Sequence, residues 1–586
     1  MATASLRQDI AKWFGEVVAA DDHLASECIS MCQMYNLSVE DLFYKWEALS
    51  YSGSARGLSI FTIKSVPDLK AQIQRELHAE TTKKQQAAAR PNATASFARG
   101  RFAGAAKFAS AGRLDAPLKL GAVPIKPANT RVGPSIKSEF ESQIAGPSRV
   151  AFQGPDNDPL SRKKRAYRYM YEKVSERSEA LDDRIDEFAE IIQKHYNIEE
   201  LGDPEAATEE PVTVVGRIVR DAEASNSGVK LDETSVVLES SRMMGSGVRV
   251  PLRFAPETKI RGGLKGIGGI GLFPGAIAAL RGRNGGGGWF VVSEILALPP
   301  MRSSPALPES DSTSFSMCIA CGPFTPDSDL EFMPWRSLVD NLKSTKPSVV
   351  LLVGPFVDVT HSRIRDGDIE ETPAQIFRRQ FTENLHDFLV VSPSSTVLVV
   401  PSVRDIISDH AVFPQCELQP ELGSDPRIRL LPNPCRFTLN GLSFAVTSVD
   451  VLFHLRKEEL FKRGEDVDPL AFQAEPINDA MASLCRDVLQ QRSFYPIFPV
   501  PQELAHEVNL DVTHSDGLRL VEGEDDFAPD VLVLPSRLKH FAKIVDGTTA
   551  INPSLLSKGT YATLSFTGSG SRATKERIKT EISRLS

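Results

Sequence analysis

The sequence predicts a multidomain protein with an N-terminal all-α domain, a small β-barrel domain and a C-terminal α/β domain. Three observations support this fold class. Apolar residues recur at helical spacing within residues 1–80, short strands separated by turn residues fill 211–300, and apolar strands alternate with amphipathic helices over 315–586. A tether at 81–160 and a long charged helix at 161–200 connect the first two domains.

The first 80 residues contain three apolar stripes that predict helices. Such stripes form a domain core in the first place, and a partner-binding groove on this domain is the alternative interpretation. The stripes consist of Leu6, Ile10, Trp13, Phe14 and Val17; of Val39, Leu42, Phe43 and Trp46; and of Leu69, Ile73 and Leu77.

Residues 81–160 are rich in Ala, Gly, Pro, Ser and basic residues without apolar periodicity, which predicts a disordered tether. Between 81 and 150, 12 Lys or Arg residues stand against 3 Asp or Glu residues. The basic cluster Arg162–Arg165 closes the segment. It is interpreted as a nuclear import signal or a weak phosphate contact, with a solvated helix start as the equal alternative. The charged helix that follows, about 162–196, keeps one apolar stripe, which favours packing on the next domain over the alternative of a partner-binding helix.

Five short strands at 211–300 predict a barrel of the OB type. OB barrels often hold single-stranded nucleic acid by stacking its bases on aromatic side chains. Aromatic residues are sparse here, and several must fill the barrel, so a domain that contacts protein is favoured. These aromatic residues are Phe254, Phe273, Trp289 and Phe290.

The C-terminal segment, 315–586, alternates strands and helices in the way that a layered α/β domain does. The strand candidates are FSMCIA, SVVLLV, TVLVV, LSFAVT, DVLVLP and YATLSF. The helix candidates between them are marked by Trp335, Leu338, Val339 and Leu342; by Phe377, Phe381, Leu385, Phe388 and Leu389; and by Ile477, Met481, Leu484, Cys485 and Val488.

Composition narrows the classes of function. The chain has 586 residues with a formal net charge of −9, which excludes a simple polyanion-binding protein. Seven scattered cysteines are too few for a disulfide scaffold and fit a reducing compartment. The N-terminal residues carry charges where a signal peptide needs an apolar core, and no segment approaches the length of a membrane span. We therefore expect a cytosolic or nuclear protein.

Glycines in the barrel region match the dinucleotide-binding pattern G-x-G-x-x-G at Gly266, Gly268 and Gly271. No clear strand leads into them, and Phe273-Pro274-Gly275 follows where a phosphate-binding helix should begin. We interpret the glycines as a flexible loop between barrel strands.

A C-x-x-C pair, Cys318 and Cys321, lies on a predicted strand. An offset of three residues on a strand sends two side chains to opposite faces, and a zinc site would need a second pair. Buried structural cysteines are therefore expected.

The stretch Ser348–Asp358, SVVLLVGPFVD, has the form of a buried parallel strand that delivers ligands to a binuclear metallophosphoesterase site. Such a site holds two metals roughly 4 Å apart with Asp, His and Asn ligands at strand ends. Here Pro355 stands in place of the bridging carboxylate, and Val403 and Arg404 stand in place of the Asn ligand and the catalytic His.

Two further ligand loops lack their metal-binding residues. Ala320–Phe324 has neither Asp nor His, and Pro535–His540 lacks a His pair. Asp358 and Asp405 remain, but two carboxylates make a poor site, and His454 and His540 are expected to be packed or superficial. We predict an inactive phosphoesterase-type domain without catalytic residues, metal ligands or cofactor.

The barrel and this emptied scaffold together resemble the B subunits of DNA polymerase α–primase over about 165–565. The resemblance implies an OB domain packed on an inactive calcineurin-like phosphoesterase domain. It is carried by RYMY at 168–171, EPVTVVGRI at 210–218, LFPG at 272–275, ACGPF at 320–324, VGPFVD at 353–358, VPSVRD at 400–405, TSVDVLFHL at 447–455, QRSFYPIFP at 491–499 and PDVLVLPSRLKHF at 529–541.

The same resemblance implies a role. Members of this family are nuclear, non-catalytic scaffolds in the initiation of DNA replication. They hold the zinc-binding C-terminal module of the catalytic polymerase subunit and, through it, the two primase subunits. Residues 1–80 would receive other replication proteins, contact with DNA would be indirect, and no membrane or cofactor is implied. Tethers of the family often carry Ser-Pro or Thr-Pro kinase sites, yet none occurs at 81–160, and Ser304-Pro305 is the nearest such dipeptide.

Aromatic residues dominate interfaces of this kind, so four of them are candidate partner anchors, although each could equally belong to the core. They are Phe413, Phe494, Tyr495 and Phe498. Three other functions remain open: a divergent metallophosphoesterase, an autonomous single-strand binder that uses the barrel and the tether, and the equivalent accessory chain of another replicative polymerase.

Overall fold

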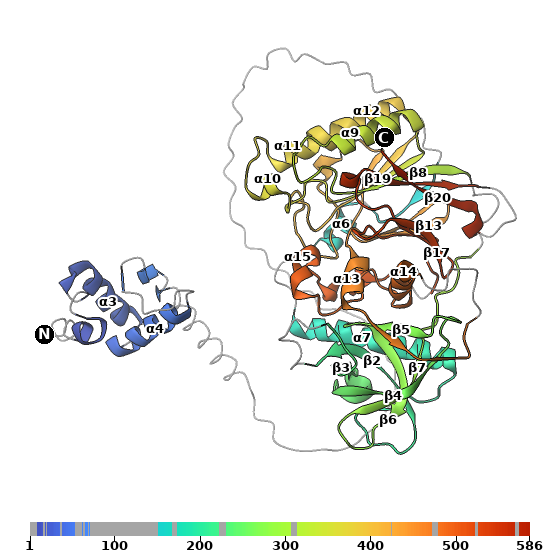
Figure 1. Ribbon diagram of the computed structural model, residues 1–586. Helices are drawn as coiled ribbons and strands as arrows, with labels where there is room; N and C mark the ends of the chain where they lie inside the picture. The colour runs from blue at the N-terminus through green and yellow to red at the C-terminus, as the bar shows by residue number, and fades with distance from the viewer. Residues whose placement is uncertain are drawn as a thin grey trace, which may run out of the picture. The chain divides into compact units, whose positions relative to one another are not determined.

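The chain divides into two units, 1–135 and 136–586 (Figure 1). The computed structural model describes residues 9–15, 18, 20–35, 38–52, 61–62, 65–67, 69–70, 150–156, 158–166, 173–221, 230–305, 313–423, 425–470, 479–521, 526–568 and 574–585. Predictions for Leu6, Val17, Ile73, Leu77 and Ile477, and for most of the tether, lie outside these residues.

Helices form most of the described part of the first unit, around an apolar centre. α3 spans Asp22–Tyr35 and α4 spans Val39–Ser52. The ring of Trp46 lies 5.8 Å from that of Phe14 and 5.7 Å from that of Phe61. Ile10, Leu42 and Leu69, one from each predicted stripe, are fully buried in this cluster.

A closed five-stranded barrel opens the second unit. Its neighbouring strands are antiparallel except for β4 and β7, which pair in parallel and close the barrel. The strands are β2 Val212–Arg220, β3 Val236–Glu239, β4 Arg249–Arg261, β6 Ile277–Arg283 and β7 Phe290–Leu296; α8 Arg242–Gly245 and β5 Gly269–Leu272 lie in the connections.

The predicted helix over 162–196 is two helices. α6 spans Pro159–Arg165 and α7 spans Val174–Tyr196. Extended backbone at Ala166 and Lys173 ends the first helix and precedes the second. α7 buries Ile185, Phe188, Ala189 and Ile192 against the barrel, because these residues recur at helical spacing on one face.

The end of the predicted tether has fixed structure. β1, Phe152–Gln153, pairs with a strand of the C-terminal domain, and Asp158 caps α6. Within the basic cluster, Arg162 and Arg165 lie 3.3 and 2.8 Å from the buried carboxylate of Glu417. Two of the four basic residues therefore hold α6 on the C-terminal domain.

The C-terminal domain places two six-stranded sheets face to face, with helices on both outer sides (Figure 1). The strands VVLLV and TVLVV, apolar apart from Thr396, are buried on both faces because another layer covers each face. In sheet order the strands are β11 Ile428–Leu430, β10 Thr396–Val400, β9 Val349–Val353, β8 Phe315–Cys321, β19 Thr560–Phe566 and β20 Ile578–Arg584; and β1, β12 Cys435–Leu439, β13 Leu442–Val446, β16 Val531–Val533, β18 Thr548–Asn552 and β17 Phe541–Val545.

Helices cover the outer sides of the sheets. α9 buries Trp335, Leu338, Val339 and Leu342, the same residues that marked it in the sequence. The helices beside the first of these sheets are α9 Met333–Thr345, α10 Ser362–Arg365, α11 Pro373–Phe377, a π-helical turn at Arg378–Thr382 and α12 Glu383–Val391; the others are α13 Val451–Glu458, α14 Ala480–Gln490, α15 Ala505–Val508 and α16 Ser515–Leu518. Short 3₁₀ turns lie at Pro420–Leu422, Gln502–Leu504, Val512–His514, Leu556–Lys558 and Thr574–Arg577.

Two strands of the C-terminal domain join the barrel domain. β14, Leu460–Arg463, pairs with β5, and β15, Glu465–Val467, pairs with β4. The G-x-G-x-x-G glycines lie in this contact rather than in a free loop, since Gly271 belongs to β5. A Cβ at Gly271 would lie 2.6 Å from Oε1 of Glu459, so glycine permits the close approach of the two domains.

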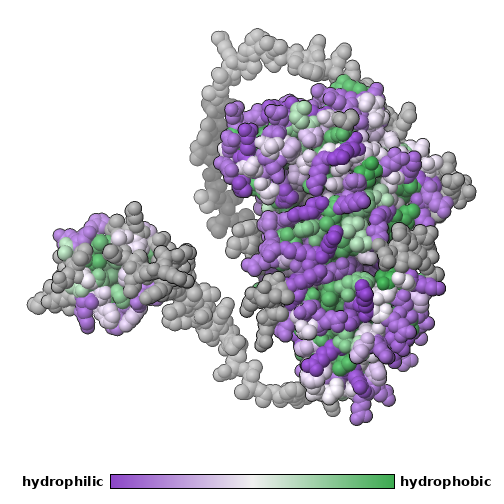
Figure 2. All heavy atoms as spheres, in the orientation of Figure 1, coloured by the Kyte–Doolittle hydropathy of each residue, from purple (hydrophilic) through white to green (hydrophobic). Residues whose placement is uncertain are grey.

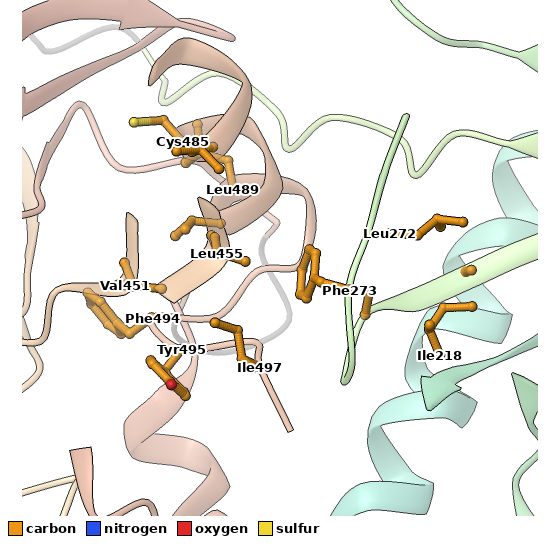
Figure 3. Close-up of a cluster of buried hydrophobic side chains, with 14 of the residues drawn as sticks. Ile218, Leu272, Phe273, Val451, Leu455, Cys485, Leu489, Phe494, Tyr495 and Ile497 are labelled. Atoms are coloured by element: carbon orange, nitrogen blue, oxygen red, sulfur yellow. The ribbon is translucent and has the colours of Figure 1, made fainter. Parts of the chain in front are cut away.

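Apolar side chains also join the barrel to the C-terminal domain. Figure 3 shows Phe273, from the loop before β6, facing Leu455, Leu489 and Ile497 of the C-terminal domain. These residues belong to one buried cluster that includes the barrel interior. The barrel and the C-terminal domain therefore share a core, which fixes their relative position.

Candidate functional site

The carboxyl ends of β8, β9 and β10 meet at one edge, because the three strands are parallel neighbours. The loops that leave these ends point aromatic rings inward. Phe324 and Phe356 stack with ring centroids 5.2 Å apart and are buried against Trp335 and Phe381. The strand ends therefore supply packing residues where a metal site needs ligands.

Glycine is required at two of these strand ends. A Cβ at Gly322 would lie 2.0 Å from the carbonyl oxygen of Pro355, and one at Gly354 would lie 2.4 Å from Oδ2 of Asp405. The loops approach one another too closely for any side chain at these positions. Pro355, in the expected position of the bridging carboxylate, faces Gly322 with its backbone.

Asp405 joins its own loop to the loop after β9 through hydrogen bonds to backbone groups. Its carboxylate accepts hydrogen bonds from the backbone N–H groups of Phe356, Val357 and Ser402, at 2.5, 3.0 and 2.8 Å. The residue is 3% exposed. Burial raises the pKa of Asp405 to about 7, although the three hydrogen bonds oppose the shift. These contacts use the carboxylate for loop structure.

Asp358 is neutralised by Arg404, the residue in the expected position of the catalytic His. The guanidinium donates to both carboxylate oxygens, with Nε 3.2 Å from Oδ1, and also donates to Oγ1 of Thr360 at 2.9 Å. A guanidinium here repels cations and satisfies the carboxylate. Arg404 and Asp405 thus both oppose metal binding at this edge.

The fourth loop, Pro535–His540, is also held by contacts within the chain. Arg537 binds the carboxylate of Asp450 at 3.0 Å and that of Glu507. Although burial opposes the shift, the hydrogen bond from His454 and the charge of Arg537 lower the pKa of Glu507 to about 2. The carboxylates near this loop are therefore paired with side chains of the chain itself.

The two histidines near these loops lie in different surroundings. His540 is exposed. His454 is fully buried, and its Nδ1 lies 2.9 Å from the hydroxyl of Tyr495. The structure thus places one of them at the surface and the other in the core.

The residues at this edge do not fit a metal pair. Among the described residues, no group of three or more His, Cys, Asp or Glu side chains is placed to hold a metal ion. The two carboxylates that remain are occupied by a guanidinium and by backbone N–H groups. We therefore derive no metal-dependent step from this edge.

The C-x-x-C cysteines lie where the strand offset predicts. Cys318 packs with the helix-covered face of β8 and Cys321 with the opposite face. Both are buried, and burial raises the pKa of Cys318 to about 12. The expectation of buried structural cysteines is confirmed.

Three of the four candidate partner anchors are buried within the chain. Phe413 and Phe494 are fully buried, and Tyr495 is 3% exposed. Their side chains are almost inaccessible to a partner in this conformation, as expected if they belong to the core. Phe498 is half-buried, and the guanidinium carbon of Arg217 lies 5.2 Å from its ring centroid.

Phe498 lines a cavity of about 440 Å³ between α7, the barrel and the C-terminal domain. The cavity also contains four arginines, Arg184, Arg217, Arg492 and Arg519. These arginines were not predicted as site residues, because they come from segments far apart in the chain. Only the phrase QRSFYPIFP at 491–499, which contains Arg492 and Phe498, drew attention to one wall.

No helix in the described part of the chain is long and apolar enough to cross a membrane. On the face drawn in Figure 2, hydrophilic residues cover most of the second unit and hydrophobic ones form small groups.

Two family models match the chain. One, which describes the B subunit of DNA polymerases alpha and epsilon, matches residues 317–543, most of the C-terminal domain. The other, which describes the OB domain of the DNA polymerase alpha B subunit, matches residues 178–298, which contain most of α7 and the barrel. The predicted OB barrel is thereby confirmed.

Curated proteins named as the B subunit of DNA polymerase alpha are similar to this chain. The one from Schizosaccharomyces pombe is 31% identical, and the match covers 92% of each chain. The one from Saccharomyces cerevisiae is 29% identical, over 68% of this chain and 60% of the relative, and the one from Bos taurus is 28% identical, over 65% and 57%.

A solved structure from Thermus thermophilus is also similar to part of this chain. It is 13% identical, and the match covers 47% of this chain and 100% of that one. Its TM-score of 0.22 is too low to carry an argument about the fold.

Proposed function

Since this chain belongs to the family of DNA polymerase alpha B subunits, accessory chains of a replicative polymerase, we propose that it is a non-catalytic scaffold that holds the C-terminal module of the catalytic subunit. The observation that carries this proposal is the strand-end edge. Arg404 neutralises Asp358 there, and buried phenylalanines fill the loops that a phosphoesterase uses for metal ligands. A domain of phosphoesterase type without metal ligands at its strand ends can still provide a rigid surface for another protein.

The shared core of the barrel and the C-terminal domain supports a scaffolding role. β14 and β15 extend the barrel domain, and apolar residues from both domains form one cluster. A platform that does not flex loses little entropy when it binds a partner. An obligate interface of this kind buries on the order of 2,000 Å² or more.

Phe498 is the remaining candidate anchor among the four aromatic residues. It is half-buried beside the cavity, while Phe413, Phe494 and Tyr495 serve the core that supports it. Partly exposed aromatic rings next to a cavity are suited to bind an inserted side chain. The wider assembly would include the two primase subunits through the catalytic subunit, other replication proteins through residues 1–80, and DNA indirectly, all in the nucleus.

A pull-down of the catalytic subunit of DNA polymerase α with purified full-length chain tests the scaffold. The wild-type chain should recover the catalytic subunit, and Phe498→Ala should reduce that recovery. Phe461→Ala is the matched control, because Phe461 lies on β14 and is 42% exposed outside the cavity. If the wild-type chain does not recover the catalytic subunit, the proposed function is wrong. If Phe498→Ala is folded and recovers as much as the wild type, only the role of Phe498 as an anchor is wrong.

The rival function, a divergent metallophosphoesterase, is tested by turnover of p-nitrophenyl phosphate with manganese. The closed strand-end edge predicts no metal-dependent activity above background. Activity that requires manganese and disappears in Asp358→Ala would overturn the scaffold.

A further inference from the structure

The cavity beside α7 has an unusual distribution of charge. Four arginines line it, and two of them have carboxylate partners in the same walls. Arg492 binds Asp526 through two hydrogen bonds of 2.8 Å, and Arg519 pairs with Glu187. The remaining two, Arg184 and Arg217, determine what the cavity can bind.

Arg217 is buried with unused hydrogen-bond donors. The residue is 6% exposed, and one terminal nitrogen donates to Glu239 at 2.5 Å. Its Nε and its other terminal nitrogen are buried without a hydrogen-bond partner in the described part of the chain. Buried donors of this kind are rare in folded proteins, because each unmade bond costs about 1–3 kcal/mol.

Arg184, unlike Arg217, has no carboxylate partner among the described residues. It donates to the carbonyl oxygen of Gln491 at 2.8 Å and lies near Phe188. The pKa of Arg184 is lowered to about 10 by burial and by the charges of Arg217, Arg519 and Arg492, against the attraction of Glu187. A neighbouring anion would relieve this cost.

We infer that the cavity accepts one carboxylate side chain of a protein partner, which Arg184 and Arg217 bind together. The guanidinium fork matches the geometry of a carboxylate. The volume of about 440 Å³ lies in the ordinary range of ligand sites, so it has room for the side chain and its neighbours. This inference rests on the proposed function, which makes the catalytic subunit the partner.

The rim of the cavity limits the sequence of the bound segment. Asp183 and Glu190 on α7 line the cavity and are exposed. Their charges would repel a run of acidic residues, so the inserted carboxylate should stand among neutral or basic residues. Phe498 and Leu181, also in the lining, would pack against apolar neighbours of that carboxylate.

The test compares the affinity of full-length variants for the catalytic subunit. Arg184→Gln/Arg217→Gln should weaken binding roughly tenfold or more, since a buried charge on the partner would lose its pair. Arg217→Lys should retain part of the affinity, because lysine keeps the charge and loses the fork. Arg249→Gln is the matched control: Arg249 pairs with the same Glu239 at 3.3 Å but is exposed outside the cavity.

Three results would overturn the inference. If wild-type chain binds the catalytic subunit and the double variant binds as well as the Arg249→Gln control, the cavity holds no partner carboxylate while the scaffold stands. If wild-type chain does not bind, the proposed function and this inference both fail. If inorganic phosphate raises the melting temperature of the isolated chain and the double variant abolishes the effect, the site takes a free anion rather than a protein carboxylate.

Discussion

The strand-end edge and the cavity beside α7 both contain charged side chains, but the cavity leaves two of its four arginines incompletely paired within the described part of the chain. Asp358 pairs with Arg404, and Asp405 accepts three backbone hydrogen bonds. In the cavity, Arg217 has donors without partners and Arg184 lacks a carboxylate among the described residues. Charged groups that are paired within the chain leave no binding site for another molecule. Hydrogen-bond donors without a partner in the chain indicate a site that another molecule completes.

The largest expected effect on stability comes from removing one of the aromatic rings buried at the strand-end edge. Phe324→Ala should lower the free energy of unfolding by about 3–5 kcal/mol, because a fully buried ring that contacts Phe356, Trp335 and Phe381 would leave a cavity. Denaturant unfolding measures this loss. Phe461→Ala, at a position 42% exposed, is the control, and an equal loss in both variants would mean that the edge is not tightly packed.

The pH dependence of stability should reveal Asp405. Its pKa of about 7 in the folded chain is above the ordinary value of 3.8, so the folded state holds a proton that the unfolded state releases first. Its contribution to stability is therefore present below pH 4 and lost as pH rises to about 7, by on the order of 4 kcal/mol at most. The unfolding free energy of the wild-type chain should therefore fall relative to that of Asp405→Asn as the pH is raised from 4 to 8. Curves that stay parallel over this range would contradict the raised pKa of Asp405.

Arg404 should matter for folding. Arg404→Ala should cost about 1–3 kcal/mol, because Asp358 is 6% exposed and would lose its charged partner, while solvent reaches part of Arg404. Arg365→Ala is the control, since its ion pair with Asp366 is largely exposed and should contribute below about 0.5 kcal/mol. Melting curves of the two variants that shift equally would show that the edge is not closed by this pair.

Arg217 should matter little for folding, in contrast to Arg404. Arg217→Gln should change the unfolding free energy of the isolated chain by about 1 kcal/mol or less, because Arg249 still pairs with Glu239 and two donors of Arg217 are unused. Chemical denaturation without the catalytic subunit measures this change. A loss as large as that of Arg404→Ala would mean that Arg217 serves the fold, and the contrast between the two regions would disappear.

Local sequence patterns predicted much of the fold. The runs VVLLV and TVLVV are β9 and β10, and the stripe of Trp335, Leu338, Val339 and Leu342 is the buried face of α9. These predictions succeed because burial on one or both faces of an element imposes a period on neighbouring residues. The break between α6 and α7 was not predicted, since the charged residues on both sides suit a helix.

The residues at the strand-end edge were also open to prediction, because ligand chemistry depends on residue type. Pro355, Val403 and Arg404 cannot hold the metals, whatever the fold around them. The sequence could not tell that Arg404 would bind Asp358, 46 positions earlier in the chain. It also could not separate Phe494, in the core, from Phe498, at the cavity, because both are aromatic residues in one irregular segment.

The sequence by itself determined the order of the elements, the burial of the strands and the residue types at the strand ends, since each depends on the type and spacing of nearby residues. Only the tertiary structure decided which charges meet. Arg184, Arg217 and Arg492 come from α7, β2 and the segment after α14, and the packing of the barrel on the C-terminal domain brings them to one cavity. Electrostatic interaction depends on distance in space, and separation along the chain does not determine that distance.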